Sequence, residues 1–192
     1  MAYVLIVYDT KEGQSHAVAE FAAAAVREAG HTLEVLDLAK LRPGRLAPHP
    51  DAVLVVASIH YGKHTAEALQ FVRQHHALLC SVPSAFFCVC LSAAQPDDPV
   101  RRDEAAGYVA SFLGQTDWQP HVAVPVAGAL RYSRYGFFKR QMLKKVAKEG
   151  GLPTDTSRDH VFTDWDAVRR HTTALLAQLA DREETAAPPT VA

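Results

Sequence analysis

Short apolar segments recur along this chain and alternate with segments of helical periodicity, and this alternation limits the fold more than any other feature. The clearest apolar segment is residues 2–8, AYVLIVY, which is rich in β-branched residues and ends at a polar loop. Such a run is typical of a strand in a parallel sheet that is covered on both faces. Residues 15–29 follow with an apolar stripe at helical spacing, Ser15 as the expected N-cap and Gly30 as the stop.

The same order of elements repeats along the chain. Further strands are expected at residues 32–38, 52–58, 84–91 and 121–126, a short extra strand at 160–163, and helices at 65–79, 104–113 and 165–179. Strands alternating with helices favour an α/β fold with a doubly wound parallel sheet. We predict one domain over residues 1–181 with five parallel strands, a basic helical insert of about residues 128–152 after or within the fifth strand, and a flexible tail over 182–192. A Pro/Gly-rich link is expected over residues 42–50.

The composition indicates a globular protein with no general nucleic-acid-binding surface. The chain has 192 residues, 48% hydrophobic and 21% charged, with a formal net charge of -1. Its three cysteines show no zinc-binding spacing, and their odd number suits a reducing compartment. His60 and His64 lack a third metal ligand nearby in the sequence. We therefore expect a cytoplasmic protein without a metal site, attached at most peripherally to the inner face of the cell membrane, because no apolar run is long enough to span it.

The loop after the first strand, DTKEGQS at residues 9–15, has the composition of a phosphate site. In a parallel sheet, ligands bind at the carboxyl ends of the strands, and the N-terminus of the following helix favours an anion. Neither common nucleotide-binding glycine motif is present. The alternative, in which Ser15 only caps the helix and Gly13 only makes the turn, stays open. The residues predicted to hold the phosphate are Thr10, Lys11, Glu12, Gly13, Gln14 and Ser15, with Glu12 acting through its backbone.

The third and fourth strands end in loops that suit a planar ring. Residues 58–64, SIHYGKH, offer a tyrosine for stacking and a glycine for close backbone approach, and residues 90–95, CLSAAQ, are small and polar. A phosphate loop and a ring slot at one sheet edge predict FMN as the cofactor. No residue is identified as a catalytic base, and His60 and Tyr61 are weak candidates for proton transfer. The residues predicted to surround the ring are Ser58, Ile59, His60, Tyr61, Gly62, Leu91, Ser92 and Ala93.

Residues 128–148 carry seven Lys and Arg residues and no acid, in a chain that is otherwise nearly neutral. As a helix from Phe137 to Lys148, the segment places Phe138, Met142, Leu143 and Val146 on one stripe. A basic amphipathic helix suits an anionic membrane surface or a substrate with carboxylates. The alternative is a helix that packs on its own domain with its lysines in solvent. The residues predicted to contact substrate or membrane are Arg131, Tyr132, Arg134, Tyr135, Lys139, Arg140, Lys144 and Lys145.

The motif T-x-x-G-x-[ST] at residues 10–15 resembles the flavodoxin family, and later stretches resemble one branch of it, the menaquinone-dependent protoporphyrinogen oxidases. The resemblance implies a flavodoxin-like fold, FMN, and the six-electron oxidation of protoporphyrinogen IX in haem biosynthesis, with a membrane quinone as acceptor. It covers nearly the whole chain except the tail. The stretches that carry it are ASIHYGKH (57–64), PSAFFCVCLSA (83–93), AGALRYSRYGFFKRQMLKKVAKEGG (127–151), TDT (154–156) and VFTDW (161–165).

The chain departs from this family pattern at His60, where an arginine is usual, at Ser133, where a proline is usual, and at two cysteines in the fourth strand. These departures leave the substrate and acceptor preference open. The competing functions are an FMN electron carrier without its own substrate and an FMN quinone reductase. Carriers typically dock on basic partners through acidic surfaces, so the basic segment disfavours the first. Homo-oligomer formation is also left open.

Overall fold

The computed structural model describes residues 1–41 and 49–186, so most of the expected link and the end of the expected tail lie outside the described residues. Five parallel strands form the central sheet in the order β2-β1-β3-β5-β6, which confirms the predicted doubly wound fold. A two-residue strand, β4 (Lys63–His64), pairs antiparallel with the end of β3. The parallel strands are β1 (Tyr3–Asp9), β2 (Thr32–Asp37), β3 (Ala52–His60), β5 (Ser84–Cys90) and β6 (Val122–Ala127).

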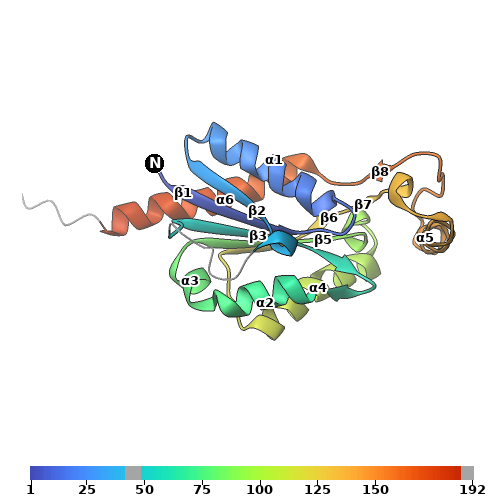
Figure 1. Ribbon diagram of the computed structural model, residues 1–192, viewed down its shortest axis with the longest axis horizontal. Coiled ribbons are helices and arrows are strands. Elements are labelled where there is room, and N and C mark those ends of the chain that lie inside the picture. Colours follow the sequence, from blue (N-terminus) through green and yellow to red (C-terminus); the bar gives the residue numbers. More distant parts are fainter. Residues whose placement is uncertain (42–48, 187–192) are drawn as a thin grey trace, which may run out of the picture.

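Helices cover both faces of this sheet (Figure 1). One face packs on α1 (Gln14–Glu28) and α6 (Trp165–Ala186). The opposite face packs on α2 (Ala66–Gln74), α3 (His76–Ser81) and α4 (Pro99–Thr116). All of β5 and the first seven residues of β3 are buried. This two-sided burial explains why these strands are continuous apolar runs and not alternating ones.

Two helices differ from the prediction because of local backbone signals. The single helix expected at residues 65–79 is divided at His75, whose backbone leaves the helical region (φ −109°, ψ 18°). Helix α4 begins at Pro99, five residues earlier than expected. There the Asp98 carboxylate accepts the N–H of Val100 at 2.9 Å, and a proline in the first turn lacks an N–H that would need a partner.

The ends of the first and last helices also differ. Gly13, with a left-handed φ of 90°, precedes α1, and no side chain among residues 1–41 and 49–186 is seen to cap the helix. Ser15 therefore lies inside the first turn, and its predicted role as N-cap is wrong. Helix α6 ends at Ala186, beyond the expected Leu179 and inside the segment expected to be tail. The 3₁₀ turns η1 (Leu38–Lys40) and η2 (Ser92–Ala94) follow β2 and β5.

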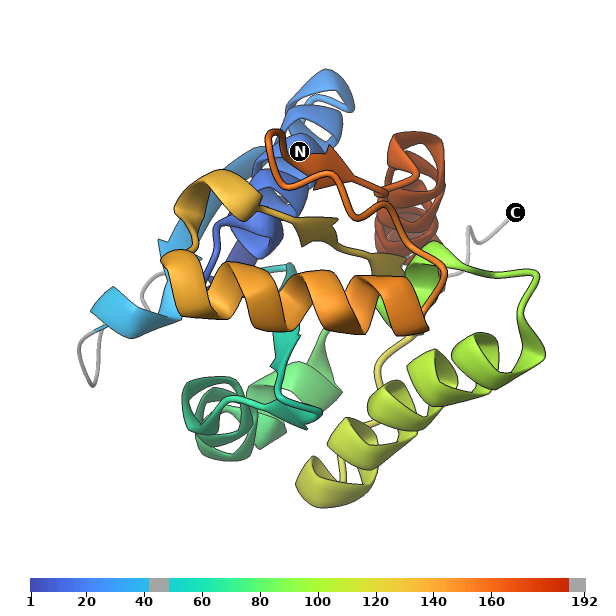
Figure 2. The ribbon, with the colours of Figure 1, turned by 90° about the vertical axis from the view of Figure 1, so that its right-hand side faces the viewer.

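The predicted helical insert follows β6 and lies across the carboxyl end of the sheet, where Figure 2 shows α5 in front of the strand ends. It contains β7 (Ala129–Leu130), η3 (Tyr132–Arg134) and α5 (Phe137–Glu149). The expected extra strand, β8 (His160–Val161), pairs antiparallel with β7 and not with the main sheet. The insert has a small core of its own. Its buried members are Leu130, Tyr132, Tyr135 and Ala147.

The apolar stripe predicted for α5 only partly faces this core. Leu143 packs against it, whereas Phe138 is 88% exposed and Met142 is 43% exposed. The side chain of Val146 lies outside the described part of the structure. No helix in that part combines enough length with enough apolar character to cross a membrane.

The carboxylate of Asp9 is buried where β1 meets the phosphate loop. Its side chain is 1% exposed, and Oδ2 accepts a hydrogen bond from Thr65 Oγ1 at 2.7 Å. Oδ1 has no hydrogen-bond partner among the described residues. Burial raises the pKa of Asp9 above its usual 3.8, although the Thr65 hydroxyl acts in the opposite direction. The native state therefore holds its proton more tightly than the unfolded state, and stability falls as the pH rises from the unfolded to the folded pKa.

Replacing this acid with an amide should stabilise the fold near neutral pH. We expect Asp9→Asn to raise the free energy of unfolding at pH 7 by on the order of 1 kcal/mol, because it removes a buried, incompletely paired charge. The gain should shrink as the pH falls toward the folded-state pKa of Asp9. Denaturant unfolding at several pH values measures it, with the exposed Asp97→Asn as the matched control. A loss of stability at pH 7, or a gain that is independent of pH, would contradict this account.

Candidate functional site

The loop between β1 and α1 presents donors for an anion. The N–H of Gly13 donates to Thr10 Oγ1 at 2.8 Å, which closes the loop at a residue that needs a left-handed φ. The first turn of α1 follows without a side-chain cap. Ser15 is fully buried there, and its Oγ has no hydrogen-bond partner in the described structure. The free N–H groups of the helix start and a buried hydroxyl without an acceptor are the donors that a phosphate needs.

A cavity of about 280 Å³ extends from this loop along the carboxyl ends of β1, β3 and β5. It joins the predicted phosphate loop and both predicted ring loops into one site, and the insert closes its outer side. Its wall is formed by Thr10, Glu12, Gln14, Ser15, Ser58, Ile59, His60, Tyr61, Gly62, Val89, Cys90, Leu91, Ser92, Gln95, Arg101, Glu104, Tyr108, Gly128, Ala129, Tyr135, Met142, Leu143, Ala147, Gly150 and Leu152.

The segment after the third parallel strand is a tight hairpin and not the expected loop. Residues 58–60 continue β3, and Tyr61 (φ 48°) and Gly62 (φ 74°) form a two-residue turn into β4. Left-handed φ at both positions is the geometry that suits the twist of a hairpin. The Tyr61 ring is 77% exposed at the cavity. His60 Nε2 lies 3.1 Å from Glu12 Oε2, so the hairpin and the phosphate loop meet across the cavity.

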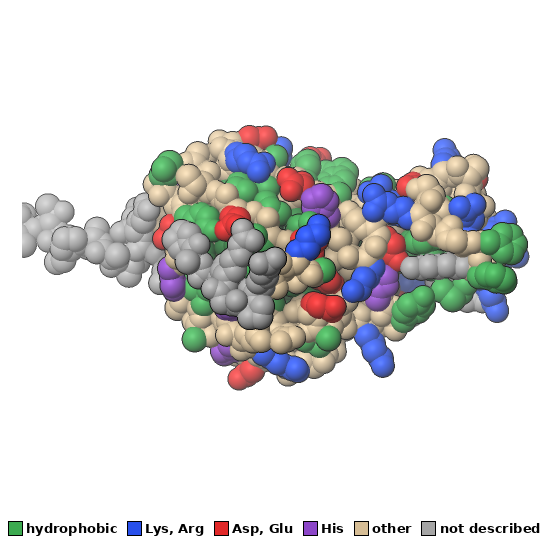
Figure 3. All heavy atoms as spheres, viewed as in Figure 1, with side chains coloured by type: hydrophobic (Ala, Val, Ile, Leu, Met, Phe, Trp, Pro, Cys, Tyr) green, Lys and Arg blue, Asp and Glu red, His purple; other side chains and the backbone are tan. Residues whose placement is uncertain are grey.

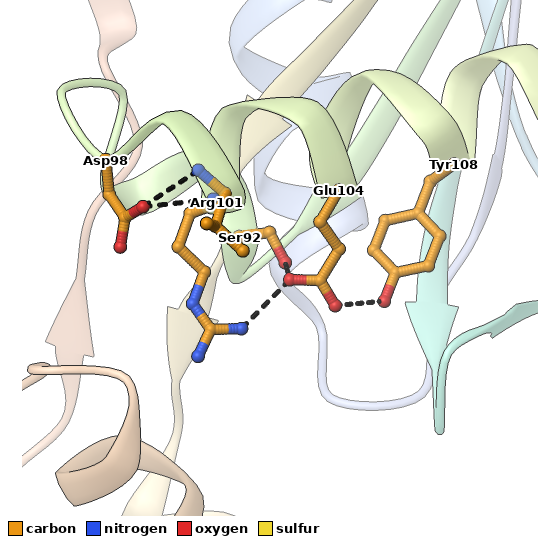
Figure 4. Close-up of polar contacts among 6 residues, drawn as sticks. Ser92, Asp98, Arg101, Glu104 and Tyr108 are labelled. Carbon is orange, nitrogen blue, oxygen red and sulfur yellow. Dashed lines mark hydrogen bonds and ion pairs between the residues drawn. The ribbon is translucent and has the colours of Figure 1, made fainter.

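A polar cluster supports the other ring loop from the side of α4 (Figure 4). The Glu104 carboxylate accepts hydrogen bonds from Ser92 Oγ at 2.8 Å, Tyr108 Oη at 2.9 Å and Arg101 Nη1 at 2.9 Å. Burial acts to raise the pKa of Glu104, but these hydrogen bonds outweigh it and lower the pKa. Burial and the bond to Glu104 raise the pKa of Tyr108 to about 12, so its hydroxyl remains a donor. The cluster thus fixes the position of Ser92 and its loop.

The insert is joined to the phosphate loop by a chain of hydrogen bonds. Arg131 Nη2 donates to Gln14 Oε1 at 2.8 Å, and Gln14 Nε2 donates to Thr163 Oγ1 at 2.7 Å. Thr163 Oγ1 donates in turn to the carbonyl of Ala127 at 2.6 Å. Arg134 lies against the same loop, because a Cβ placed on Gly13 would come within 2.6 Å of its Nη1.

Most residues predicted to surround the cofactor line the cavity, whereas Lys11, Gly13 and Ala93 do not. Lys11 turns away, with Nζ 3.7 Å from Glu67 Oε1. Of the residues predicted for substrate or membrane, Tyr135 lines the cavity and Tyr132 is buried in the core of the insert. Arg140 donates to the carbonyl of Tyr135, Lys144 and Lys145 are exposed on α5, and the side chain of Lys139 lies outside the described structure.

Sequence reasoning missed the residues that α4 and α5 supply to the cavity. Arg101, Glu104 and Tyr108 follow a spacing of three and four residues, which places them on one face of a helix. That spacing is a usable signal only if the helix is known to begin before Arg101. The sequence pattern places Met142 in an apolar stripe and Gln95 in a polar loop, and neither placement predicts a position at the cavity. No group of three or more candidate metal ligands occurs in the described part of the chain.

Comparison with known proteins agrees with this geometry. The flavodoxin domain family matches residues 5–157. The protoporphyrinogen IX dehydrogenase (quinone) of Escherichia coli K12 is 34% identical over 178 residues, which cover 93% of this chain and 96% of that protein. The protein of the same name from Leishmania major is 36% identical over 169 residues, 86% of this chain and 71% of that protein.

Solved flavodoxins share the fold at low sequence identity. A short-chain flavodoxin associated with a non-canonical PDU bacterial microcompartment has a TM-score of 0.58 at 11% identity, covering 93% of this chain and 99% of that one. Flavodoxin 1 from Bacillus cereus has a TM-score of 0.52 at 14% identity, and the match covers 92% of this chain and 98% of that one. Fold, phosphate loop and family match together define a flavodoxin-type oxidoreductase that uses FMN. Within this class, the chain belongs to the family of quinone-dependent protoporphyrinogen IX dehydrogenases.

The buried hydroxyl of Ser15 gives a direct test of the phosphate site. We expect Ser15→Ala to weaken FMN binding about tenfold, which corresponds to about 1.4 kcal/mol, while riboflavin, which lacks the phosphate, binds as before. The apoprotein should keep its stability because the hydroxyl has no partner to lose among the described residues. Quenching of flavin fluorescence measures both affinities, and Ser157→Ala, which removes an exposed hydroxyl between α5 and β8, is the control. An equal loss for both flavins would contradict the assignment.

Proposed function

We propose that the protein oxidises protoporphyrinogen IX to protoporphyrin IX in haem biosynthesis and passes the electrons to menaquinone. The observation that carries this proposal is the wall that α5 adds to the flavin cavity. Met142, Leu143 and Ala147 of α5 line the cavity together with the polar cluster on α4. An electron carrier needs an exposed cofactor edge for its partner, whereas a covered apolar space beside the cofactor suits a substrate. The names of the relatives, which align over most of this chain, support the same substrate and a quinone acceptor.

Different residues at the cavity would have different roles in such a reaction. Bound FMN supplies two-electron redox chemistry, so three turnovers account for six electrons. The exposed ring of Tyr61 offers a face against which a planar ring packs, and Ser92 is held in place by Glu104. Arg101, whose side chain is 33% exposed, places a cation at the cavity for a propionate of the substrate. His60, close to Glu12, remains the candidate for proton transfer.

The reaction itself is the first test. We expect FMN-loaded protein, mixed anaerobically with protoporphyrinogen IX and a menaquinone analogue, to produce protoporphyrin IX. The flavin absorbance should fall as the substrate reduces FMN and recover as the quinone reoxidises it. Porphyrin fluorescence follows the product. Without quinone, turnover should stop once the bound flavin is reduced. Failure to form porphyrin in the presence of quinone would overturn the oxidase proposal, and quinone reduction by a nicotinamide cofactor instead would favour the reductase.

We also propose that α5 attaches the protein to an anionic membrane surface, where a membrane quinone is dissolved. Phe137 is 70% exposed and Phe138 is 88% exposed at the start of the helix. Lys144, Lys145 and Lys148 are exposed further along it. In Figure 3, hydrophobic and basic side chains gather at the end of the molecule that the insert forms. Exposed aromatics next to lysines suit the interface of an anionic bilayer.

Removing the two aromatic rings should weaken this attachment. We expect the double variant Phe137→Ser, Phe138→Ser to reduce partitioning onto phosphatidylglycerol-containing vesicles at least tenfold in a sedimentation assay. The reason is that the variant lacks the apolar surface that the two rings would bury in the bilayer interface. Val100→Ser is the matched control, since Val100 is 71% exposed on α4, outside the insert. Unchanged partitioning of the double variant would remove the membrane role of these residues.

A further inference from the structure

The phosphate loop lacks a positive charge of its own that is free to meet FMN. Three carboxylates lie in or near it, with Asp9 at its start, Glu12 within it and Glu67 beside it. Its only lysine, Lys11, is paired with Glu67. The FMN phosphate carries about −1.5 to −2 charges at pH 7, because its second pKa is about 6. The helix N-terminus contributes a partial charge of only about +0.5. Binding of a dianion at this loop therefore calls for cations from another segment.

The insert brings two arginines to this loop. The guanidinium of Arg134 lies beside Gly13, and its Nη1 would be 2.6 Å from a Cβ at that position. A side chain at this position would have to displace the guanidinium, in addition to straining the left-handed turn. Arg134 is exposed despite this contact, so its guanidinium donors remain accessible to a phosphate.

Arg131 reaches the same loop from the other end of η3. Its Nη2 holds Gln14, and its Nη1 lies 3.9 Å from Asp159 Oδ2. Its Nε is buried and has no hydrogen-bond acceptor among the described residues. A buried donor without an acceptor is costly, and a bound anion nearby would satisfy it. Within the described structure, the fully buried Ser15 Oγ, at the start of the helix and in the cavity wall, lacks a partner as well.

We propose that Arg131 and Arg134 of the insert bind the phosphate of FMN, so that the segment that covers the substrate space is itself held by the cofactor. This inference rests on FMN binding and not on the porphyrinogen substrate. The proposal assigns the two arginines, which lie beside the phosphate loop, to the cofactor, and the exposed lysines of α5 to other contacts. By linkage, FMN then stabilises the docked position of the insert, and riboflavin does not.

Binding of two flavins to the full chain tests the proposal. We expect Arg134→Gln to weaken FMN binding about tenfold and to leave riboflavin binding unchanged, so that the ratio of the two dissociation constants falls by the same factor. Arg134→Lys should recover part of this loss, because it restores the charge without the planar fork. The salt dependence of FMN affinity should also become shallower in Arg134→Gln. Arg158→Gln is the matched control, since Arg158 is exposed between α5 and β8 and pairs with Asp155.

The outcomes separate the proposal from its alternatives. An unchanged ratio of FMN to riboflavin affinity in Arg134→Gln would overturn it. Equal weakening of both flavins would also overturn it, since it would indicate a structural role. An unchanged ratio with weaker binding to phosphatidylglycerol vesicles would assign Arg134 to the lipid surface instead. The flavin titrations do not depend on porphyrinogen turnover, so they can succeed when the proposed oxidase activity fails.

The coupling between cofactor and insert has its own readout. We expect FMN to slow amide hydrogen exchange in residues 137–149 of the wild-type protein, and riboflavin to have little effect there. In Arg134→Gln this protection by FMN should largely disappear, measured at flavin concentrations that saturate both proteins. Equal protection by FMN and riboflavin in the wild type would contradict the phosphate contact, because only FMN carries the group that the arginines are proposed to hold.

Discussion

The covering of the sheet on both faces is the constraint on which the rest of this structure depends. β3 lies between β1 and β5, its ladder uses the backbone groups on both sides, and helices bury its side chains above and below. Ligand binding is therefore excluded from the body of the sheet and is confined to the edge where the strands end. Because parallel strands end at the same edge, loops that are distant in the sequence meet there. The cavity joins the ends of β1, β3 and β5 for this reason.

The insert is attached to this edge of the sheet. Its own buried core is small, with Leu130, Tyr132, Tyr135 and Ala147 as its buried members. It is attached by polar contacts as well, above all through Gln14, which bonds Thr163 across 149 positions and also accepts from Arg131. One side chain of the phosphate loop therefore fixes both the end of the main sheet and the start of the insert. The phosphate loop and the segment that closes the cavity are therefore positioned by the same contacts.

The fold and the phosphate loop were predictable because their signals are local. Continuous apolar runs such as residues 52–58 identify buried parallel strands, and Thr10 and Gly13 mark the loop that follows the first one. The cluster of Arg101, Glu104 and Tyr108 was not predictable in the same way. Its charges resemble a solvated helix face until the start of α4 and the position of Ser92 are known. The burial of Tyr132 likewise depends on how the insert folds back, which no local pattern specifies.

The basic segment also shows why composition alone could not assign its charges. Its arginines contact the protein: Arg131 bonds Gln14, Arg134 lies on Gly13, and Arg140 donates to the carbonyl of Tyr135. The described lysines of α5, such as Lys144 and Lys148, are exposed. A guanidinium offers several donors in one plane and suits a fixed acceptor, whereas an ammonium on a flexible stem suits a diffuse negative surface. The division between the two residue types therefore agrees with the two roles proposed above for one stretch of positive charge, in which the arginines bind the cofactor phosphate and the lysines face lipid.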